Sequence, residues 1–472
     1  MSGLDAGLAA LRNAIRSRRL AAHSLAVIVG GEFVAEEYWQ PYRQGMRQMV
    51  FSVSKTLTAT AIGFGQAEGL WDIDDDVLRH FPSYAGSWAR RNAAGVRIRD
   101  LLTMSTGHTV DTMEVMRAQP EADWVRVFFD IPFECEPGSH FLYNSGASFV
   151  LSALVQCRTG LTLREYLQPR LFAPLGISGV PWESNVRGIN YGASGARLNV
   201  RELALLGQLF LDGGCWQGRQ VLPAGWAGQA SARQVPTPLS ADAEASCGYG
   251  FQMWRGSLGS YRLDGRYEQL SVVLPDANAV IAVTAGTPDR HPLLDAIIET
   301  LAPALLGGEA SEPAQPVAQL DAGPEVPLPF TSQPSPDWSV PFAGVCRLGR
   351  NQLGVQQVEL RLAADREGRA DGVSIVLRGP NATETFTASF TGWQQGETRF
   401  WPYEEMDSVR FFARAGWQDA RTLLVYCQVV DSPFARIWSF RLNGQALEVL
   451  ARLDNGFWQD RWEIRAEDST IA

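Results

Sequence analysis

Lysine is almost missing from this sequence. Lys and Arg together number 41, and since only Lys55 is a lysine, the remaining 40 are arginines. Arginine keeps its proton in proteins, whereas a buried lysine readily loses one. A position that keeps lysine against such a bias is a candidate for an amine that acts as a base.

Cysteine and histidine are also scarce, and neither shows the spacing of a metal site. The six cysteines are widely scattered without a Cys-x-x-Cys pair, so we expect reduced, structural thiols. The five histidines have no paired placement, and His-Glu-x-x-His, P-loop and Gly-x-Gly-x-x-Gly motifs do not occur. The nearest match to Gly-x-Ser-x-Gly, at 192–195, has the wrong spacing. We therefore predict no metal and no cofactor.

Positive charge and long apolar runs are in deficit too. The net charge of −10 and the pI near 5.2 argue against nucleic acid or an anionic membrane as partner. No apolar run reaches about 18 residues, so none is expected to span a membrane. Residues 1–20 show the spacing of an amphipathic helix rather than a signal peptide's continuous apolar core. We expect a cytoplasmic protein, and the sequence leaves its oligomeric state open.

The stretch 50–63 carries the strongest candidate for chemistry. It predicts an amphipathic helix that begins at Ser52, and Lys55 lies one turn further along the same face. The positive end of the helix dipole favours a developing oxyanion at Ser52. A neutral amine at Lys55 can take the serine's proton. Ser-x-x-Lys is a weak signal alone, but here it contains the single lysine of the chain.

Hydrophobic patterning divides the 472 residues into two domains. Residues 1–306 predict a helix, a hairpin, many helices, four antiparallel strands and a last helix, which is typical of an α/β (α+β) fold with a mainly antiparallel sheet. The four strands are expected at 249–254, 260–263, 270–274 and 279–284. Residues 307–341, rich in proline, predict a linker. Residues 342–472 predict an all-β domain, an antiparallel barrel or sandwich.

Two further stretches supply groups that an activated serine needs. Tyr143 lies on a polar turn before a helical run and can relay a proton between lysine and leaving group, if the lysine lowers its pKa. A structural hydrogen bond at a helix start is the alternative role for this tyrosine. Gly265, at a strand edge, lets a substrate carbonyl approach the backbone, where the N–H of Arg266 can face it.

Taken together, these motifs resemble the serine β-lactamase and penicillin-binding protein superfamily. In chain order they are Ser52-x-x-Lys55, the stretch 101–107, Glu136-Pro-Gly followed by Tyr143-Asn-Ser145, and Gly265-x-x-x-Gln269. The branch that the chain looks most like holds class C β-lactamases, esterases, D-aminopeptidases and 6-aminohexanoate-dimer hydrolases. The resemblance covers roughly residues 5–306 and implies the β-lactamase-like fold with its helical subdomain. The C-terminal β-domain is similar only in architecture to the barrel of some D-aminopeptidase-like members.

By this resemblance, Ser52 is the acylated nucleophile, Lys55 the base and Tyr143 the proton relay. The backbone N–H groups of Ser52 and Arg266 form the oxyanion hole. Ser145 and Gly265 join Arg266 as substrate-binding positions. We expect an enzyme of the serine hydrolase class, with a small-molecule ester or amide as its substrate.

Two departures from the family pattern bear on that substrate. Ser145 takes the place of an asparagine in the second motif, and residues 263–265, Leu-Asp-Gly, replace the Lys-Thr-Gly of class C β-lactamases. The family's lysine holds a substrate carboxylate, which Asp264 would repel unless Arg262 or Arg266 restores the anchor. We therefore predict cleavage of a small ester or amide through an acyl-enzyme. The alternatives are β-lactamase or D-peptidase activity, and a catalytically silent binding protein.

Overall fold

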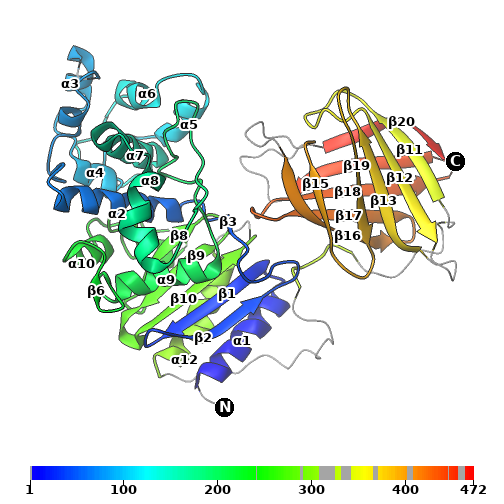
Figure 1. Ribbon diagram of the computed structural model, residues 1–472, viewed down its shortest axis with the longest axis horizontal. Coiled ribbons are helices and arrows are strands. Elements are labelled where there is room, and N and C mark those ends of the chain that lie inside the picture. The colour runs from blue at the N-terminus through cyan, green and yellow to red at the C-terminus, as the bar shows by residue number, and fades with distance from the viewer. Residues whose placement is uncertain are drawn as a thin grey trace. The chain divides into compact units, whose positions relative to one another are not determined.

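The computed structural model describes residues 3–84, 86–240, 242–287, 291–307, 325–330, 338, 342–364, 370–400, 408–444, 446–454 and 463–471 (Figure 1). Contacts divide the chain into two units. The first holds residues 1–38 and 47–321, and the second holds 39–46 and 322–472. The linker expected at 307–341 lies mostly outside the described residues, so the domain boundaries drawn from the sequence stay a prediction.

A six-stranded antiparallel sheet forms the base of the first unit. In spatial order its strands are β2 (Glu32–Tyr38), β1 (Ala22–Val29), β10 (Ala279–Ala285), β9 (Gln269–Leu274), β8 (Tyr261–Gly265) and β7 (Trp254–Arg255). β10 is buried along its whole length and β1 along nearly all of it, as expected for strands covered on both faces. α9 (Val200–Leu211) packs against β1, β9 and β10, while α1 (Gly3–Ser17) packs against the helical run 292–305.

The other helices form a layer around α2 (Val53–Ala67), whose residues 53–65 are all buried. These helices are α3 (Ser87–Asn92), α4 (Ile98–Leu102), α5 (Thr112–Arg117), α6 (Trp124–Asp130), α7 (Ser145–Thr159), α8 (Leu163–Leu167) and α10 (Trp226–Ser231). α2 packs against α7, α8 and β8. Two short strand pairs complete the unit: β3 (Gln48–Met49) with β4 (Arg197–Leu198), and β5 (Cys215–Trp216) with β6 (Arg219–Gln220). Since α2 is enclosed by sheet and helices, its first turn is held rigidly.

The elements expected from the sequence are mostly present in the first unit. Three of the four late strands and the helix at 53–67 are confirmed, and the last helix runs through α11 (Pro292–Ala296), a π-helical turn (Ile297–Leu301) and α12 (Ala302–Leu305). The strand expected at 249–254 is wrong over most of its length. Gln252 has a positive φ of 58° and Gly250 N–H donates to the Met253 carbonyl, so the backbone turns there and only β7 remains extended.

The second unit is an antiparallel-rich sheet of ten strands that nearly closes. In spatial order they are β14 (Thr383–Ser389), β13 (Ala370–Arg378), β12 (Gln357–Ala364), β11 (Phe342–Leu348), β20 (Glu463–Ile471), β19 (Ala446–Asp454), β18 (Ala435–Asn443), β17 (Thr422–Val429), β16 (Val409–Asp419) and β15 (Gln394–Thr398). A parallel bridge between Ser389 and Arg414 joins β14 to β16. The sheet edges are thereby almost removed, as in a barrel.

Residues 39–46 leave the first unit and belong to the second. The carbonyl of Gln40 accepts from the Val326 N–H at 3.0 Å, and Tyr42 is buried. The Arg43 guanidinium lies 5.9 Å from the centre of the Phe412 ring. The chain then returns to the first unit just before β3. None of the helices in the described ranges is long and apolar enough to cross a bilayer.

Candidate active site

Ser52 occupies the N-cap of α2, where the helix begins. A serine at this position ordinarily accepts a hydrogen bond from the first turn. In the described structure, however, the Ser52 side chain accepts no hydrogen bond from an N–H of the first turn. The preceding residue, Phe51, has a positive φ of 44°, a conformation that costs energy for a residue with a side chain. Ser52 is also partly exposed, so its hydroxyl is accessible and is not used for capping.

Lys55 lies directly beneath this hydroxyl and is only 1% exposed. Its Nζ is 3.3 Å from the Oγ of Ser52, 3.3 Å from the Oγ of Ser145 and 3.0 Å from the carbonyl oxygen of Ala193. A neutral amine has two N–H donors and one lone pair. It can therefore donate to Ser145 and Ala193 while accepting the hydroxyl proton of Ser52.

The electrostatics of the site favour that neutral amine. Burial lowers the pKa of Lys55 to about 7, while the charge of Asp111 acts to raise this pKa and that of Arg117 to lower it. A pKa near 7 leaves a substantial fraction of the amine unprotonated at neutral pH. The sequence interpretation required a neutral amine at Lys55 if this lysine is to act as a base.

Tyr143 reaches the same serine from a different segment of the chain. The Ser52 side chain is near enough to the Tyr143 hydroxyl to act on its pKa, and the Tyr143 ring centre lies 4.9 Å from the Lys55 Nζ. The ring stacks on Trp254 with centroids 5.7 Å apart. Burial raises the pKa of Tyr143, and the interaction with Ser52 opposes this only partly. The phenol is therefore neutral and can act as a proton donor, whereas it is a poor base.

Ser145 begins α7, directly after the N-cap residue Asn144. The Oδ1 of Asn144 accepts from the N–H and hydroxyl of Thr112 and from the N–H of Gly146. This asparagine therefore links the start of α5 to the start of α7. The N–H of Ser145 donates to the Oδ1 of Asp111 at 2.8 Å. These contacts fix the Ser145 hydroxyl beside Lys55.

Gly265 is the last residue of β8 and pairs with Gln269 of β9. On the other side, the register of β7 reaches only Tyr261 and Arg262 within the described residues, so Gly265 lies at the strand edge that the sequence suggested. A Cβ at this position would lie 2.1 Å from the carbonyl oxygen of Val50, two residues before Ser52. Glycine is therefore required for β8 to approach the backbone that leads to Ser52. The side chain of the next residue, Arg266, is exposed, and its guanidinium lies 5.3 Å from the Tyr267 ring centre.

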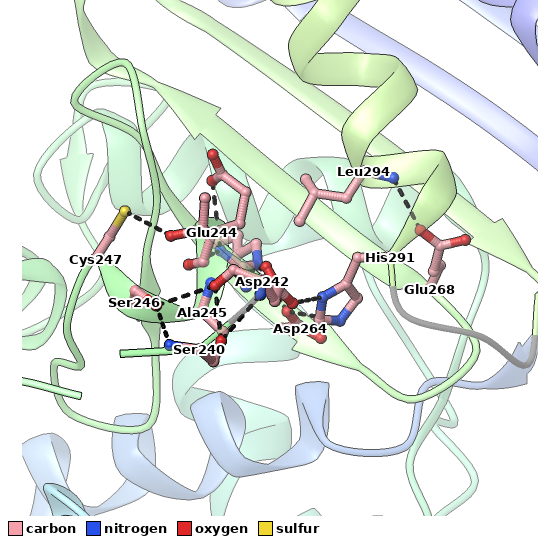
Figure 2. A network of polar contacts seen from close by, with 12 residues as sticks. Ser240, Asp242, Glu244, Ala245, Ser246, Cys247, Asp264, Glu268, His291 and Leu294 are labelled. Carbon is pink, nitrogen blue, oxygen red and sulfur yellow. Dashed lines mark hydrogen bonds and ion pairs between the residues drawn. The ribbon is translucent and has the colours of Figure 1, made fainter. Parts of the chain in front are cut away.

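Arg262, one of the two arginines considered as a carboxylate anchor, is buried and already engaged. Its Nε donates to the Oδ2 of Asp264 at 2.7 Å, and its Nη1 to the carbonyl oxygens of Glu244 and Arg255. Figure 2 shows Asp264 and Glu244 in this network together with His291. The Asp264 carboxylate is therefore neutralised within the protein, and Arg262 is committed to it.

Sequence reasoning missed three groups that contact the candidate residues. Asp111 holds the Ser145 N–H, the Ala193 carbonyl accepts from Lys55, and Trp254 stacks on Tyr143. Any residue type presents a carbonyl, so no sequence signal reports Ala193. The stretch 192–195 was noticed only as a failed nucleophile motif, yet it supplies this contact.

Comparisons with known proteins bear on the family and the fold of this chain. A family model described as Beta-lactamase matches residues 8–302. The chain is 27% identical over 293 residues to a 6-aminohexanoate-dimer hydrolase of Paenarthrobacter ureafaciens, covering 56% of this chain and 73% of that protein. It is 28% identical over 165 residues to a D-aminopeptidase of Brucella anthropi, covering 32% and 31%, and 28% identical over 159 residues to a lovastatin esterase of Penicillium rubens, covering 29% and 40%.

The fold extends over both units in one solved protein. A crystal structure of SurE has a TM-score of 0.53 and 17% identity, covering 98% of this chain and 99% of that one. A structure of SurE with D-Leu has a TM-score of 0.52 at 17% identity, covering the same shares. At this identity the likeness concerns the fold alone.

Proposed function

The chain belongs to the beta-lactamase family, and on this premise we propose that it is a serine hydrolase that cleaves a small ester or amide through an acyl-enzyme on Ser52. Relatives with hydrolase names support the hydrolase class. The observation that carries the finer assignment is the buried amine of Lys55, 3.3 Å from the Ser52 hydroxyl, with its pKa lowered to about 7. A catalytically silent protein would have no use for a desolvated lysine at this position.

In the first step of the proposed reaction, the Ser52 hydroxyl transfers its proton to Lys55 as Oγ attacks the substrate carbonyl carbon. The carbonyl electron pair moves to oxygen. The resulting oxyanion accepts from the N–H groups of Ser52 and Arg266, with the α2 dipole adding to its stabilisation.

In the second step, the tetrahedral intermediate collapses and expels the alcohol or amine. The leaving group takes a proton from the Tyr143 hydroxyl, which is replenished by the proton held on Lys55. Because the pKa of Tyr143 is raised, the phenol stays protonated until negative charge develops on the leaving group. Water then gives a proton to Tyr143 while Tyr143 passes its own proton to Lys55, and the water oxygen attacks the acyl carbon. The bond to Ser52 Oγ breaks, Oγ takes the proton from Lys55, and the acid is released with the serine restored.

Covalent labelling tests this assignment. A fluorophosphonate probe should add one adduct to the intact protein, and peptide mapping should place it on Ser52. Ser54, Ser145 and Ser194 are nearby alternatives, and an adduct on any of them would remove Ser52 as the nucleophile. Absence of labelling in correctly folded protein would favour the silent binding protein instead.

The pH profile should follow Lys55. Since the base must be neutral, kcat/KM for an ester is expected to rise with pH through about 7 and to level off above it. Asp111→Asn keeps an oxygen acceptor for Ser145 but removes the charge that raises the pKa of Lys55, so the rise should move to lower pH. Arg117→Gln should move it to higher pH. Profiles of the three proteins measure this, and a rise that neither variant displaces would argue against Lys55.

Short esters should be turned over better than β-lactams. A charge-assisted hydrogen bond to the β-lactam carboxylate is worth roughly 1.5–3 kcal/mol, or roughly 10- to 150-fold at about 1.4 kcal/mol per decade. The third-motif lysine is replaced by the buried Leu263, and Arg262 is bound to Asp264. We expect kcat/KM for p-nitrophenyl butyrate to exceed that for nitrocefin by at least this factor.

Arg266 provides the control for substrate choice, because it is the remaining arginine that could meet a carboxylate. Arg266→Ala should change neither the ester-to-nitrocefin ratio of kcat/KM nor kcat/KM for the ester by more than a few-fold. The proposed reaction uses only the backbone N–H of Arg266, which the alanine variant keeps. A higher kcat/KM for nitrocefin than for the ester, lost in Arg266→Ala, would replace the esterase proposal with a β-lactamase.

A further inference from the structure

The turn between β8 and β9 is pressed against the chain that leads to the nucleophile. Gly265 abuts the Val50 carbonyl, and the ring of Tyr267 meets that of Phe51 edge-on with centroids 5.3 Å apart. Tyr267 and Glu268 both have positive φ, 61° and 63°. Two consecutive left-handed residues with side chains are unfavourable, so the turn needs contacts that hold it.

Glu268 makes such a contact. Its buried Oε1 accepts from the N–H groups of Leu293 and Leu294, at 2.7 and 2.9 Å, in the first turn of α11. Those N–H groups have no partner inside their own helix. On the other side of the turn, the Oδ2 of Asp264 lies 3.8 Å from the Nε2 of His291. Figure 2 shows both carboxylates directed at the segment 291–294. The turn is thus tied to α11 through Glu268, and His291 lies close to Asp264 on the other side of the turn.

We propose that Glu268 is a positioning residue for the oxyanion hole. By fixing the turn to α11, it holds the backbone N–H of Arg266 in the orientation that a substrate oxyanion requires. Arg266 is separated from Glu268 by one residue, so a shift of the turn displaces its N–H directly. This inference rests on the proposed hydrolase function and adds a residue that touches neither substrate nor Ser52.

The chemistry of the contact defines the informative substitutions. Both hydrogen bonds go to one oxygen, so Glu268→Gln keeps the acceptor, whereas Glu268→Ala leaves two buried N–H groups without it. Burial raises the pKa of Glu268 to about 7, and the neutral acid also keeps a carbonyl acceptor. The amide should therefore substitute for the acid. Asp295→Ala, which removes an exposed carboxylate from the same helical turn, is the matched control.

The test compares p-nitrophenyl acetate with its thionoester, in which sulfur replaces the carbonyl oxygen. Sulfur is a weaker and longer hydrogen-bond acceptor, so an intact oxyanion hole prefers the oxygen ester. Removing an oxyanion donor outright costs about 10²–10³ in rate, and for a displaced donor we expect about 10- to 100-fold in kcat with Glu268→Ala on the oxygen ester. The thionoester rate should fall much less, so the oxygen-to-sulfur ratio should drop about tenfold. Glu268→Gln and Asp295→Ala should keep the wild-type ratio.

Each outcome separates this inference from the proposed function. If Glu268→Ala lowers both rates equally, its role is merely structural and the inference fails while the hydrolase proposal stands. If its ratio and kcat equal those of the wild type, the inference fails likewise. If Glu268→Ala does not fold, Glu268→Gln decides. A lower oxygen-to-sulfur rate ratio in Glu268→Gln would overturn the inference. The wild-type ratio with the wild-type kcat would support the view that the retained oxygen acceptor holds the turn. If the wild type forms no adduct on Ser52, the proposed function and the inference fall together.

Discussion

Replacing Lys55 with arginine is expected to lower kcat/KM for p-nitrophenyl butyrate by about 10³-fold or more, although charge and approximate length are kept. General-base catalysis contributes about 10²–10⁴-fold, and a guanidinium supplies none of it because it stays protonated. Arginine also presents only donors, so it cannot accept the Ser52 proton. Steady-state kinetics, with circular dichroism to check the fold, measure the effect.

Lys55→Met separates the base from the burial of charge. Methionine fills nearly the same space without a proton acceptor, so this variant should be equally inactive while melting no lower than the wild type. If the arginine variant kept activity within tenfold of the wild type, Lys55 would not be the base. If the methionine variant alone stayed active, neither charge nor basicity at this position would matter.

Replacing Ser52 with alanine is expected to lower kcat on the order of 10⁴-fold or more, because nucleophile and base act as a unit. Removal of the hydroxyl leaves Lys55 without an atom to deprotonate. The substitution is small, and since the hydroxyl does not cap α2, the cost in stability should be slight. Kinetics with enzyme purified away from contaminating esterases, together with loss of fluorophosphonate labelling, measure the result.

Ser139→Ala is the matched control for this experiment. Ser139 is an exposed serine shortly before Tyr143, and in the described part of the chain its hydroxyl donates to the nearby Glu136 carbonyl. The control should be labelled and turn over substrate like the wild type. Residual labelling of Ser52→Ala at the wild-type rate would show that a different nucleophile carries the reaction.

The candidate site residues could be proposed from the sequence because each depends on residue type. Lys55 stands out by composition, and Tyr143 and Gly265 by their motifs; the structure brings all three to the chain around Ser52. The Ala193 carbonyl and the Asp111 carboxylate could not be proposed. They reach the site through loops whose path depends on the packing of α2 and α7, which local patterns do not report.

Among the strands, prediction succeeded where apolar residues form unbroken runs, as in β9 and β10. It failed at 249–254, where aromatic residues are spaced like a strand but Gln252 turns the backbone. In the second unit, β15 and β20 are polar enough to pass for loops, and their extended form is set by pairing with neighbouring strands. Such strands depend on tertiary contacts rather than on their own propensity.

Because residues 39–46 belong to the second unit, the chain cannot be cut at one point into two complete units. No single cut in the gene separates two complete units, because the N-terminal portion carries a stretch whose Tyr42 is buried among residues far along the chain. A shortened gene ending near residue 306 would encode a segment without its packing partners. The two units are therefore expected to fold together from one continuous chain, rather than as exchangeable modules joined end to end.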